Sequence, residues 1–237
     1  MRKAALVTGG ARRIGREIAL ALTRVGYDIA LHYSTSAADA HRTAVEIREL
    51  GSACETFRCD LAKPARMLAL VGRVAERMPG LELLVNNASV FRKGSIADTD
   101  SALFDSHLNV NLRAPFFLTR EFARLCGRGQ VVNLLDSRID RDDFSYAAYT
   151  IAKKALAALT RMAAREFGPA IRVNAIAPGP VLPPEGSNRA AFLKIAGSVP
   201  LARPGSPELI AKAVIHLLEN DYLTGQIIYV DGGEHLK

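Results

Sequence analysis

The sequence predicts an α/β protein built on one doubly wound parallel sheet of about seven strands, with helices on both faces. Two observations predict it. Short apolar runs alternate with longer stretches in which apolar residues recur every three or four positions, the spacing of one helix face. The short runs are apolar almost throughout, as strands are when both faces of a parallel sheet are buried. Strands and helices in strict alternation form a sheet covered on both sides.

The individual elements follow in chain order. Pro115 lies inside a helical stretch, and we expect a kink or a late helix start there, because proline cannot donate a backbone hydrogen bond. The expected strands are residues 4–8, 28–33, 53–59, 81–86, 130–135, 171–176 and 226–230. The expected helices are residues 14–25, 37–50, 64–78, 101–126, 149–167 and 207–218, with a short helix near 189–196.

The chain has 237 residues, of which 49% are hydrophobic, so we expect residues 1–237 to form a single domain. The region 178–207 is rich in proline and glycine and has no strong period, which indicates a long substrate loop at about 178–205. The first apolar stretch is too short for a secretory signal or a membrane span. Cys54, Cys59 and Cys126 have neither metal-ligand nor disulfide spacing. We therefore expect a cytoplasmic protein that binds no metal and no membrane.

The net charge of +7 raises the question of a nucleic-acid partner. Lysine and arginine are scattered along the chain, however, and form neither a basic run nor an aromatic-basic module. A basic protein also concentrates a small polyanionic ligand around itself. We expect a small-molecule partner and no nucleic acid.

A glycine-rich turn follows the first strand directly and runs into a helix. It reads Thr-Gly-Gly-Ala-Arg-Arg-Ile-Gly over residues 8–15. Glycine permits a tight turn and close backbone approach, and the helix N-terminus offers free N–H groups to a pyrophosphate. An ordinary strand-to-helix turn would not need two arginines. We expect a Rossmann-type dinucleotide site with contacts from Gly9, Arg12, Arg13, Ile14 and Gly15.

The residues after the second strand indicate which dinucleotide binds. An NAD site usually has Asp or Glu there, whereas this chain has no carboxylate between Tyr33 and Asp39. A 2′-phosphate would be tolerated and could meet three hydroxyl side chains and an arginine of the turn. We expect NADP(H), with contacts from His32, Tyr33, Ser34, Thr35 and Ser36.

Asp60 and Leu61 close the third strand, where a carboxylate can accept a hydrogen bond from the adenine amino group. Pro64 follows closely, so Asp60 could also cap the next helix. The two roles are compatible, and we expect both residues to contact the cofactor.

Beyond the fourth strand the chain resembles the short-chain dehydrogenase/reductase family. The motifs that carry the resemblance stand in the family's order: the glycine turn, Asp60, Asn87-Ala88, Asn111-Leu112, Tyr149 to Lys153, Arg172-Val173-Asn174, Pro178-Gly179 and Val230 to Gly233. It covers nearly the whole chain and implies a single Rossmann-type oxidoreductase domain, assembled as a homotetramer or homodimer. It also implies cofactor contacts from Asn87, Ala88, Ser89, Tyr149, Lys153, Pro178, Gly179 and Val181.

Tyr149 and Lys153 lie one helical turn apart, on one helix face. An ammonium group near a phenol stabilises the phenolate and brings its pKa closer to the working pH. We therefore expect Tyr149 to be the proton donor. The resemblance adds that Lys153 holds the nicotinamide ribose and that Asn111 supports a water between this lysine and solvent.

Two departures from the family pattern narrow the substrate class. Thirteen residues before the tyrosine, where most members have serine, this chain has Asp136, followed by Ser137. The central glycine of the cofactor turn is replaced by Arg13. These two changes make the chain resemble pteridine and dihydromonapterin reductases. Three further stretches point the same way: Asn87-Ala88-Ser89-Val90-Phe91, Leu31-His32-Tyr33 and the ending Asp231 to Lys237. That resemblance implies an aspartate bonded to the tyrosine, an arginine near the phosphates and substrate, and a phenylalanine stacked on the pterin.

The chemistry of a pterin agrees with this resemblance. A planar heterocycle suits an aromatic face opposite the nicotinamide, here Phe91, and its ring nitrogen must gain a proton when hydride adds to the neighbouring carbon. An Asp136–Tyr149 pair could relay that proton, and Ser89 could bond the ring edge. The expected catalytic residues are Asn111, Asp136, Tyr149 and Lys153. The expected substrate-binding residues are Arg13, Ser89, Phe91, Asp136, Tyr149, Pro180 and Leu182.

We therefore expect NADPH-dependent reduction of a dihydropterin or related pterin. One alternative is a carbonyl or 3-oxoacyl-thioester reductase in which Ser137 polarises the ketone, Asp136 caps a turn and Phe91 packs beneath the long loop. Another is a regulatory protein that binds NADP(H) without turnover, although an intact Asn-Tyr-Lys set argues against it.

Overall fold

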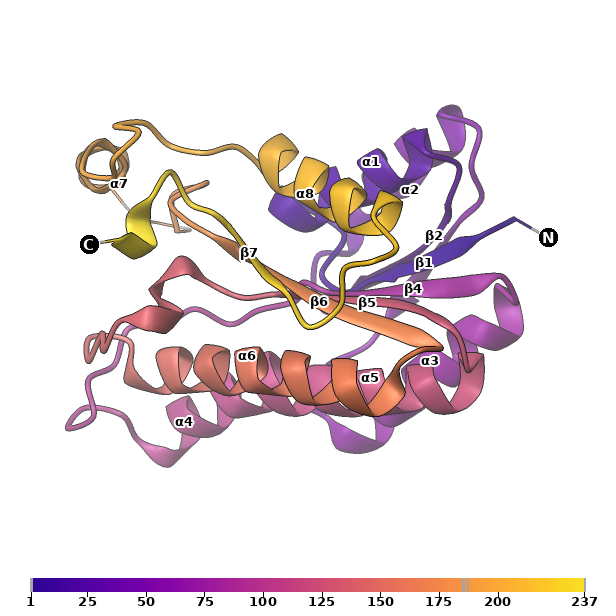
Figure 1. Ribbon diagram of the computed structural model, residues 1–237, viewed down its shortest axis with the longest axis horizontal. Helices are drawn as coiled ribbons and strands as arrows, with labels where there is room; N and C mark the ends of the chain where they lie inside the picture. Colours follow the sequence, from indigo (N-terminus) through magenta and orange to yellow (C-terminus); the bar gives the residue numbers. More distant parts are fainter. Residues whose placement is uncertain (1, 185, 187, 237) are drawn as a thin grey trace.

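The computed structural model describes residues 2–184, 186 and 188–236, and one parallel sheet of seven strands forms its centre (Figure 1). Met1, Glu185, Ser187 and Lys237, which belong to the expected domain and loop, lie outside the described residues. The strand order is β3-β2-β1-β4-β5-β6-β7. The strands are β1 (Ala4–Val7), β2 (Asp28–Tyr33), β3 (Cys54–Arg58), β4 (Leu81–Asn86), β5 (Gly129–Leu134), β6 (Ile171–Pro178) and β7 (Ile227–Val230). The expected doubly wound Rossmann-type sheet is confirmed.

Helices cover both faces of this sheet (Figure 1). Alternate residues of β1 explain why: Ala5 and Val7 belong to one apolar core, and Ala4 and Leu6 to the core on the opposite face. On the first face lie α1 (Arg13–Arg24), α2 (Ala37–Glu49) and α8 (Pro207–Glu219). On the second face lie α3 (Pro64–Arg77), α4 (Ser101–Leu108), α5 (Ala114–Cys126) and α6 (Ala147–Phe167).

The sheet reverses its winding direction at β1. Val7 at the end of β1 is in register with Leu31 of β2 on one side and with Val85 of β4 on the other. In open α/β sheets, ligands bind outside the carboxyl ends of the strands at such a reversal. The loops that leave β1, β2 and β4 at this point carry most of the predicted cofactor residues.

The expected helix at 101–126 is interrupted. The π-helical turn η1 (Asn109–Arg113) separates α4 from α5, and the N–H of Ala114 donates to the carbonyl of Asn109, five residues earlier. Pro115 follows immediately, in the first turn of α5, where it supplies no N–H to the helix ladder; of the two outcomes expected at Pro115, a kink or a late helix start, the structure shows a new α-helix that begins at Ala114. Asn111 therefore lies in a π-turn and not in regular α-helix, and π-turns are frequent at functional sites.

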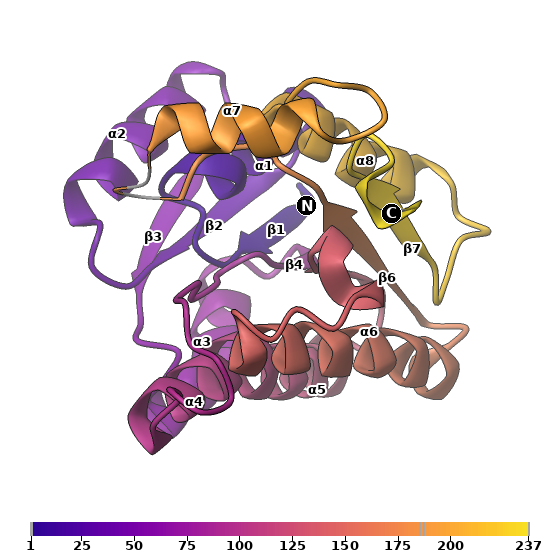
Figure 2. The ribbon, with the colours of Figure 1, turned by 90° about the vertical axis from the view of Figure 1, so that its left-hand side faces the viewer.

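The long segment after β6 contains α7 (Arg189–Gly197), which confirms the expected short helix and lies in front of α1 in Figure 2. Short 3-10 turns, η2 (Ser137–Asp140) and η3 (Glu234–Leu236), follow β5 and β7. Within the described ranges, no helix is long and apolar enough to cross a membrane. The described side chains also include no group of three or more His, Cys, Asp or Glu residues that could hold a metal ion.

Candidate active site

A cavity of about 510 Å³ opens at the carboxyl ends of the strands, where the winding of the sheet reverses. The loops after β1, β2, β3 and β4 line it together. All cofactor residues predicted from these four loops border this cavity: Gly9, Arg12, Arg13, Ile14, Gly15, His32, Tyr33, Ser34, Thr35, Ser36, Asp60, Leu61, Asn87, Ala88 and Ser89.

The glycine turn is built tightly against the loop after β4. Gly9 has φ of +62°, and a Cβ on Gly15 would lie 2.2 Å from the carbonyl oxygen of Gly9. Only glycine fits at either position without strain. The side-chain amide of Asn87 donates to the carbonyls of Thr8 and Gly9 at 2.8 and 3.1 Å. Asn87 therefore fixes the turn against which the cofactor would lie.

His32 has a scaffold role that the sequence did not reveal. Its Nδ1 accepts from the N–H of Gly9 at 3.0 Å, so the proton is on Nε2, which lies 3.0 Å from the carbonyl of Cys59. Burial lowers the pKa of His32 to about 4, and the ring stays neutral. Both ring nitrogens thus hold backbone groups, while His32 itself borders the cavity as expected for a cofactor residue.

Two helix N-termini begin at this cavity. Among the described residues, neither Arg12 before α1 nor Ser36 before α2 makes a side-chain capping bond to its helix. Uncapped N-terminal amides and the positive end of the helix dipole favour anions. A pyrophosphate at α1 and a 2′-phosphate near α2 fit this pair of helix ends.

Asp60 shapes the turn after β3 without capping α3. Its Oδ1 accepts from the N–H of Ala62 at 3.0 Å, and the residue before α3 is Lys63. The helix-cap alternative is therefore corrected. Asp60 borders the cavity beside Leu61, as expected for a residue near adenine.

Arg13 connects the glycine turn to the loop after β6. Its φ of +55° lies in the left-handed region that residues other than glycine rarely occupy. Its Nη2 donates to the carbonyl of Pro183 at 2.7 Å. One guanidinium thus lies beside the cofactor turn and also holds the long loop.

The first residues of that loop are held by the body of the protein. A Cβ on Gly179 would lie 2.6 Å from Cα of Asp231, so the loop passes very close to the end of β7. The carbonyl of Pro180 accepts from the N–H of Gly205 at 3.0 Å and closes the base of the loop. Val181 is buried in the apolar core and Leu182 packs against it. The side chain of Val181 therefore packs in the core, so a contact of this residue with the cofactor would come from its backbone.

Tyr149 and Asp136 form a direct hydrogen bond. The Tyr149 hydroxyl donates to Oδ2 of Asp136 at 2.8 Å. Burial raises the pKa of Tyr149 well above its ordinary value, and the negative charge of Asp136 raises it further. The phenol of the free protein therefore stays protonated and donates its hydrogen bond to Asp136.

The ammonium of Lys153 bonds to a backbone carbonyl. Its Nζ donates to the carbonyl of Leu134 at 2.6 Å and lies 5.7 Å from the centroid of the Tyr149 ring. Burial lowers the pKa of Lys153 to about 8. The expected lowering of the Tyr149 pKa by this ammonium is wrong for the free protein, because burial and Asp136 dominate at the phenol.

Asn111, in the π-turn, ties that turn to the loop after β4. Its Oδ1 accepts from the N–H of Val90 at 2.9 Å, and its Nδ2 donates to the carbonyl of Val90 at 2.8 Å. His107 lies one turn earlier, with Nδ1 3.3 Å from Nδ2 of Asn111 and its ring edge-on to Tyr149 at 6.0 Å. His107 was not among the predicted site residues, since nothing in its sequence context marks it, yet it is buried beside Tyr149.

Phe91 belongs to a group of aromatic side chains beside Tyr149. Its ring stacks on Tyr146 at 4.5 Å and meets Tyr149 edge-on at 4.8 Å. The guanidinium of Arg138 lies 5.2 Å from the centroid of Phe91. Tyr146 and Arg138 were missed by the sequence analysis, although each lies within three residues of a predicted site residue. Ser89, two residues before Phe91, is exposed at the cavity.

Ser137 faces away from the tyrosine. It is buried, and its hydroxyl donates to Oε2 of Glu234 at 2.6 Å. The turn after β5 therefore presents Asp136 to Tyr149 and presents Ser137 to the C-terminal segment. The alternative in which Ser137 polarises a ketone finds no support in this geometry.

This fold and site define a class: a Rossmann-type oxidoreductase with a tyrosine and a lysine beside a dinucleotide cavity. A family model described as enoyl-(acyl carrier protein) reductase matches residues 9–235. Granaticin polyketide synthase putative ketoacyl reductase 2 of Streptomyces violaceoruber is 35% identical over 98% of this chain and 96% of its own length. Short chain dehydrogenase/reductase AacuN of Aspergillus aculeatus is 31% identical over 97% of this chain and 94% of its own.

Two solved structures are similar along the whole chain. FolM alternative dihydrofolate reductase 1 from Brucella suis, in complex with NADP, has 36% identity and a TM-score of 0.95, and covers 99% of this chain and 96% of its own. The Brucella canis protein of that name, complexed with NADP, has 36% identity and a TM-score of 0.92, with 99% and 95% covered.

The chain belongs to the short-chain dehydrogenase/reductase family. It is an oxidoreductase, and the cofactor of its cavity is NADP(H), in agreement with the residues after β2, which lack the carboxylate of an NAD site.

Proposed function

We propose that this protein reduces a dihydropterin or a related pterin to the tetrahydro form, with NADPH as the reductant. One observation carries the proposal: the Tyr149 hydroxyl bonds to a carboxylate, Asp136, at the position where most of the family has a serine. The likeness to two FolM alternative dihydrofolate reductases supports the same substrate class.

NADP(H) would be held by residues that border the cavity. The glycine turn and the start of α1 suit the pyrophosphate, and the hydroxyls of Ser34, Thr35 and Ser36 with Arg12 suit the 2′-phosphate. Asp60 suits the adenine amino group, and Lys153 the nicotinamide ribose. When bound, the reduced nicotinamide supplies the hydride that adds to a ring carbon of the substrate.

The chain's own residues would orient the substrate and protonate it. Phe91, backed by Tyr146, offers an aromatic face for a planar ring, and the exposed Ser89 lies next to it. Arg13 and the loop residues Pro180 and Leu182 would form the opposite wall, with the loop 178–205 over the substrate. Tyr149 would give a proton to the ring nitrogen beside the reduced carbon.

The competing candidate is a ketone or 3-oxoacyl-thioester reductase, which the likeness to a ketoacyl reductase favours. Such a reaction needs hydrogen-bond donors toward the developing oxyanion. Asp136 is a carboxylate, and Ser137 is bonded to Glu234, so Tyr149 would have to act as the only donor. This geometry makes a pterin, which needs a proton on nitrogen, the better substrate.

The test follows NADPH absorbance with dihydrobiopterin and, separately, with an acetoacetyl thioester. We expect rapid oxidation with the pterin, lost in Tyr149→Phe and strongly reduced in Asp136→Ser. Turnover of the thioester alone, or a fully active Asp136→Ser enzyme, would assign the protein to the ketone reductases. NADPH binding without turnover of either substrate would assign it to the regulatory class.

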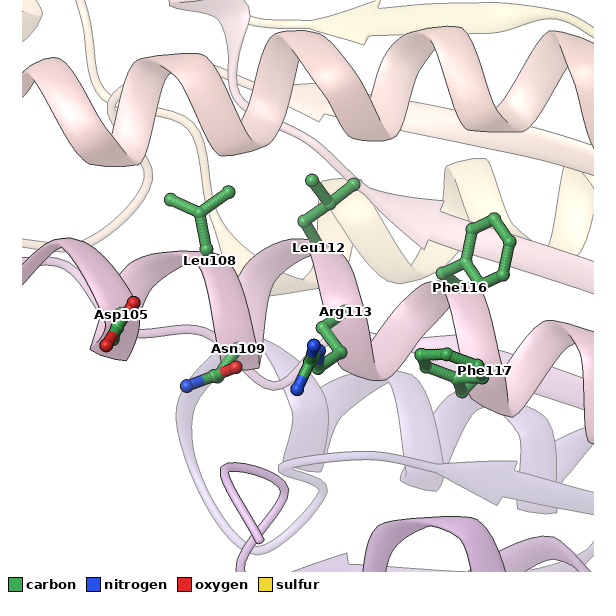
Figure 3. Close-up of a pocket in the computed structure, with 7 residues that line it drawn as sticks. All are labelled: Asp105, Leu108, Asn109, Leu112, Arg113, Phe116 and Phe117. Atoms are coloured by element: carbon green, nitrogen blue, oxygen red, sulfur yellow. The ribbon is translucent and has the colours of Figure 1, made fainter. Parts of the chain in front are cut away.

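We also propose a homodimer or homotetramer. A second cavity of about 520 Å³ lies along α4, η1 and α5, where Leu108, Leu112 and Phe116 follow one another along the helix (Figure 3). Phe116 and Ile151 of α6 are about half exposed, and Met162 of α6 is about two-thirds exposed. A second copy of the chain would cover this apolar face. Phe116→Arg should lower the mass measured by light scattering, whereas Tyr222→Arg, at an exposed aromatic residue elsewhere, should not.

We further propose a cytoplasmic location, because Cys54, Cys59 and Cys126 are all free thiols. Cell fractionation with an antibody to the protein tests this location. The protein should be recovered with cytosolic markers, and recovery from a secreted or oxidising compartment would contradict it.

A further inference from the structure

Arg138 forms a bidentate ion pair with the carboxylate of Asp136. Its Nε donates to Oδ1 at 3.0 Å and its Nη2 donates to Oδ2 at 3.1 Å. The backbone N–H of Arg138 also donates to Oδ1, at 2.9 Å. With the Tyr149 hydroxyl on Oδ2, each carboxylate oxygen accepts two hydrogen bonds. A carboxylate offers about four acceptor sites, so a proton on Asp136 would displace one of these donors.

Arg138 is itself fixed in this position. Its Nη1 donates to Oδ2 of Asp143 at 3.3 Å. Its guanidinium lies 5.2 Å from the ring centroid of Phe91, 5.3 Å from that of Tyr146 and 6.0 Å from that of Tyr149. A guanidinium held by two carboxylates and three aromatic rings has little freedom to leave Asp136.

We propose that Arg138 is a positioning residue that keeps Asp136 a permanent anionic acceptor, so that Tyr149 alone of the pair gives a proton to the substrate. This inference rests on the proposed reductase function and changes the role of Asp136 in it. Asp136 orients the phenol and never carries the transferred proton, in contrast to the Asp136–Tyr149 relay expected from the sequence.

The charges around Asp136 agree with this assignment. Burial would raise the pKa of Asp136, but the hydrogen bonds and the charge of Arg138 outweigh burial and hold that pKa below its ordinary value. The other charged or titratable groups that face it are Tyr149 and Lys153 on α6. Asp143 faces Arg138 from the following loop, and Arg138 thus balances two carboxylates.

The proposed reduction transfers one proton and one hydride to the substrate. The O–H bond of Tyr149 breaks and an N–H bond forms on the substrate, and the electron pair of the O–H bond stays on the phenolate oxygen. Hydride from NADPH reduces the adjacent ring carbon, and NADPH is oxidised to NADP⁺. Water then returns one proton to the phenolate, while the protonation of Asp136 is unchanged throughout.

The experiment titrates Asp136 directly, by ¹³C NMR of protein labelled in its aspartate carboxyl groups and bound to NADP⁺. Asp136→Asn identifies the signal by its absence. The comparison is between wild type, Arg138→Met, Arg138→Lys and Lys154→Met. Lys154→Met is the matched control, because it removes an exposed lysine paired with Asp142 on the outer side of α6.

We expect the Asp136 signal of the wild type and of Lys154→Met to stay ionised down to the lowest pH at which the protein remains folded. In Arg138→Met the signal should titrate at a higher pH, and in Arg138→Lys at a pH between the two. NADPH oxidation by Arg138→Met should then fall as pH falls through the new pKa, by roughly tenfold for each unit below it. Raising the pH should restore it, which a merely misfolded variant would not show.

Three results would overturn the inference. One is a wild-type Asp136 that titrates within the working pH range while activity follows its protonated form. Another is an Arg138→Met protein whose Asp136 titrates as in the wild type, and the third is an Arg138→Met enzyme more active at low pH. The titration needs no pterin. Failure of the protein to reduce pterins would therefore refute the proposed function, and the titration would still show whether Arg138 keeps Asp136 ionised.

Discussion

The Ser137 hydroxyl bonds to the Glu234 carboxylate at 2.6 Å, which joins the turn after β5 to the C-terminal segment of the chain. The two residues are 97 positions apart in the sequence. This contact turns the one serine of the catalytic turn away from Tyr149 and leaves Asp136 as the partner of the phenol. The proposed substrate class, a pterin rather than a ketone, depends on which of these two residues faces Tyr149.

Ser137→Ala tests the consequence for activity. The hydroxyl faces Glu234, so pterin reduction should change less than about twofold, while removal of a buried hydrogen bond should cost about 1–2 kcal/mol of unfolding free energy. Steady-state kinetics and urea unfolding measure the two effects. A loss of turnover above tenfold at unchanged stability would mean that Ser137 works on the substrate.

Tyr149→Phe tests the proton donor. The ring still fits against Phe91, but the hydroxyl that bonds to Asp136 is gone, so turnover should fall by about 10²- to 10⁴-fold, the usual contribution of a positioned acid. NADPH binding, measured by fluorescence titration, should be nearly unchanged. Turnover that survives the substitution would identify another donor, with Asp136 the first to consider.

Ser34→Asp tests the choice of cofactor. A carboxylate at the end of β2 would accept from the ribose hydroxyls of NADH and repel the 2′-phosphate of NADPH. We expect the ratio of kcat/KM for NADPH to that for NADH to fall by at least about tenfold, the equivalent of 1.4 kcal/mol. Ser89→Asp, in the loop after β4 that borders the same cavity, is the control for a new charge in the site. An unchanged ratio in Ser34→Asp would place the 2′-phosphate elsewhere.

The lowered pKa of His32 predicts that the free energy of unfolding decreases at acid pH. Its folded pKa of about 4 lies below its unfolded value of 6.5, so the unfolded chain binds the proton first as pH falls. The stability that neutral His32 contributes is complete above pH 6.5 and should decrease by about 3 kcal/mol as pH falls toward 4. Urea unfolding between these pH values should show the slope in the wild type and in His41→Gln, a substitution at an exposed position. His32→Gln should show much less slope, and an equal slope would refute the assignment.

The lowered pKa of Lys153 predicts that kcat/KM for NADPH decreases at alkaline pH. Its pKa in the free protein is lowered to about 8 by burial, so the ammonium is present at neutral pH and is lost as pH rises through 8. If that ammonium holds the nicotinamide ribose, kcat/KM for NADPH should fall above about pH 8, since this parameter reports the free enzyme. Lys153→Met should have a low kcat/KM for NADPH at every pH, without the fall above about pH 8. If that fall persists in the variant, it would belong to the titration of another group.

The sheet and the cofactor turn were predictable because their signals are local. A strand buried on both faces must be apolar throughout, and the turn after β1 needs glycine at Gly9 and Gly15 for reasons that depend on a few neighbouring atoms. Pro115 gave the same kind of local signal for the break in the helix that contains Asn111.

The electrostatics of the site were not predictable, because they depend on which groups meet in space. The spacing of Tyr149 and Lys153 suggested an ammonium next to the phenol, but Lys153 bonds to the carbonyl of Leu134, and Asp136 is the charge that reaches the hydroxyl. Arg138 follows Asp136 by two residues, and only the fold of the turn brings its guanidinium back onto that carboxylate.

The most direct test of the central claim is the ratio of kcat/KM for dihydrobiopterin to that for an acetoacetyl thioester, measured with NADPH on the wild-type enzyme and on Asp136→Ser. A site in which a fixed carboxylate holds the Tyr149 hydroxyl predicts a ratio well above one for the wild type and a ratio at least about tenfold lower for Asp136→Ser. A wild-type ratio below one, or the same ratio in both enzymes, would contradict the claim that the Asp136–Tyr149 pair makes this protein a pterin reductase.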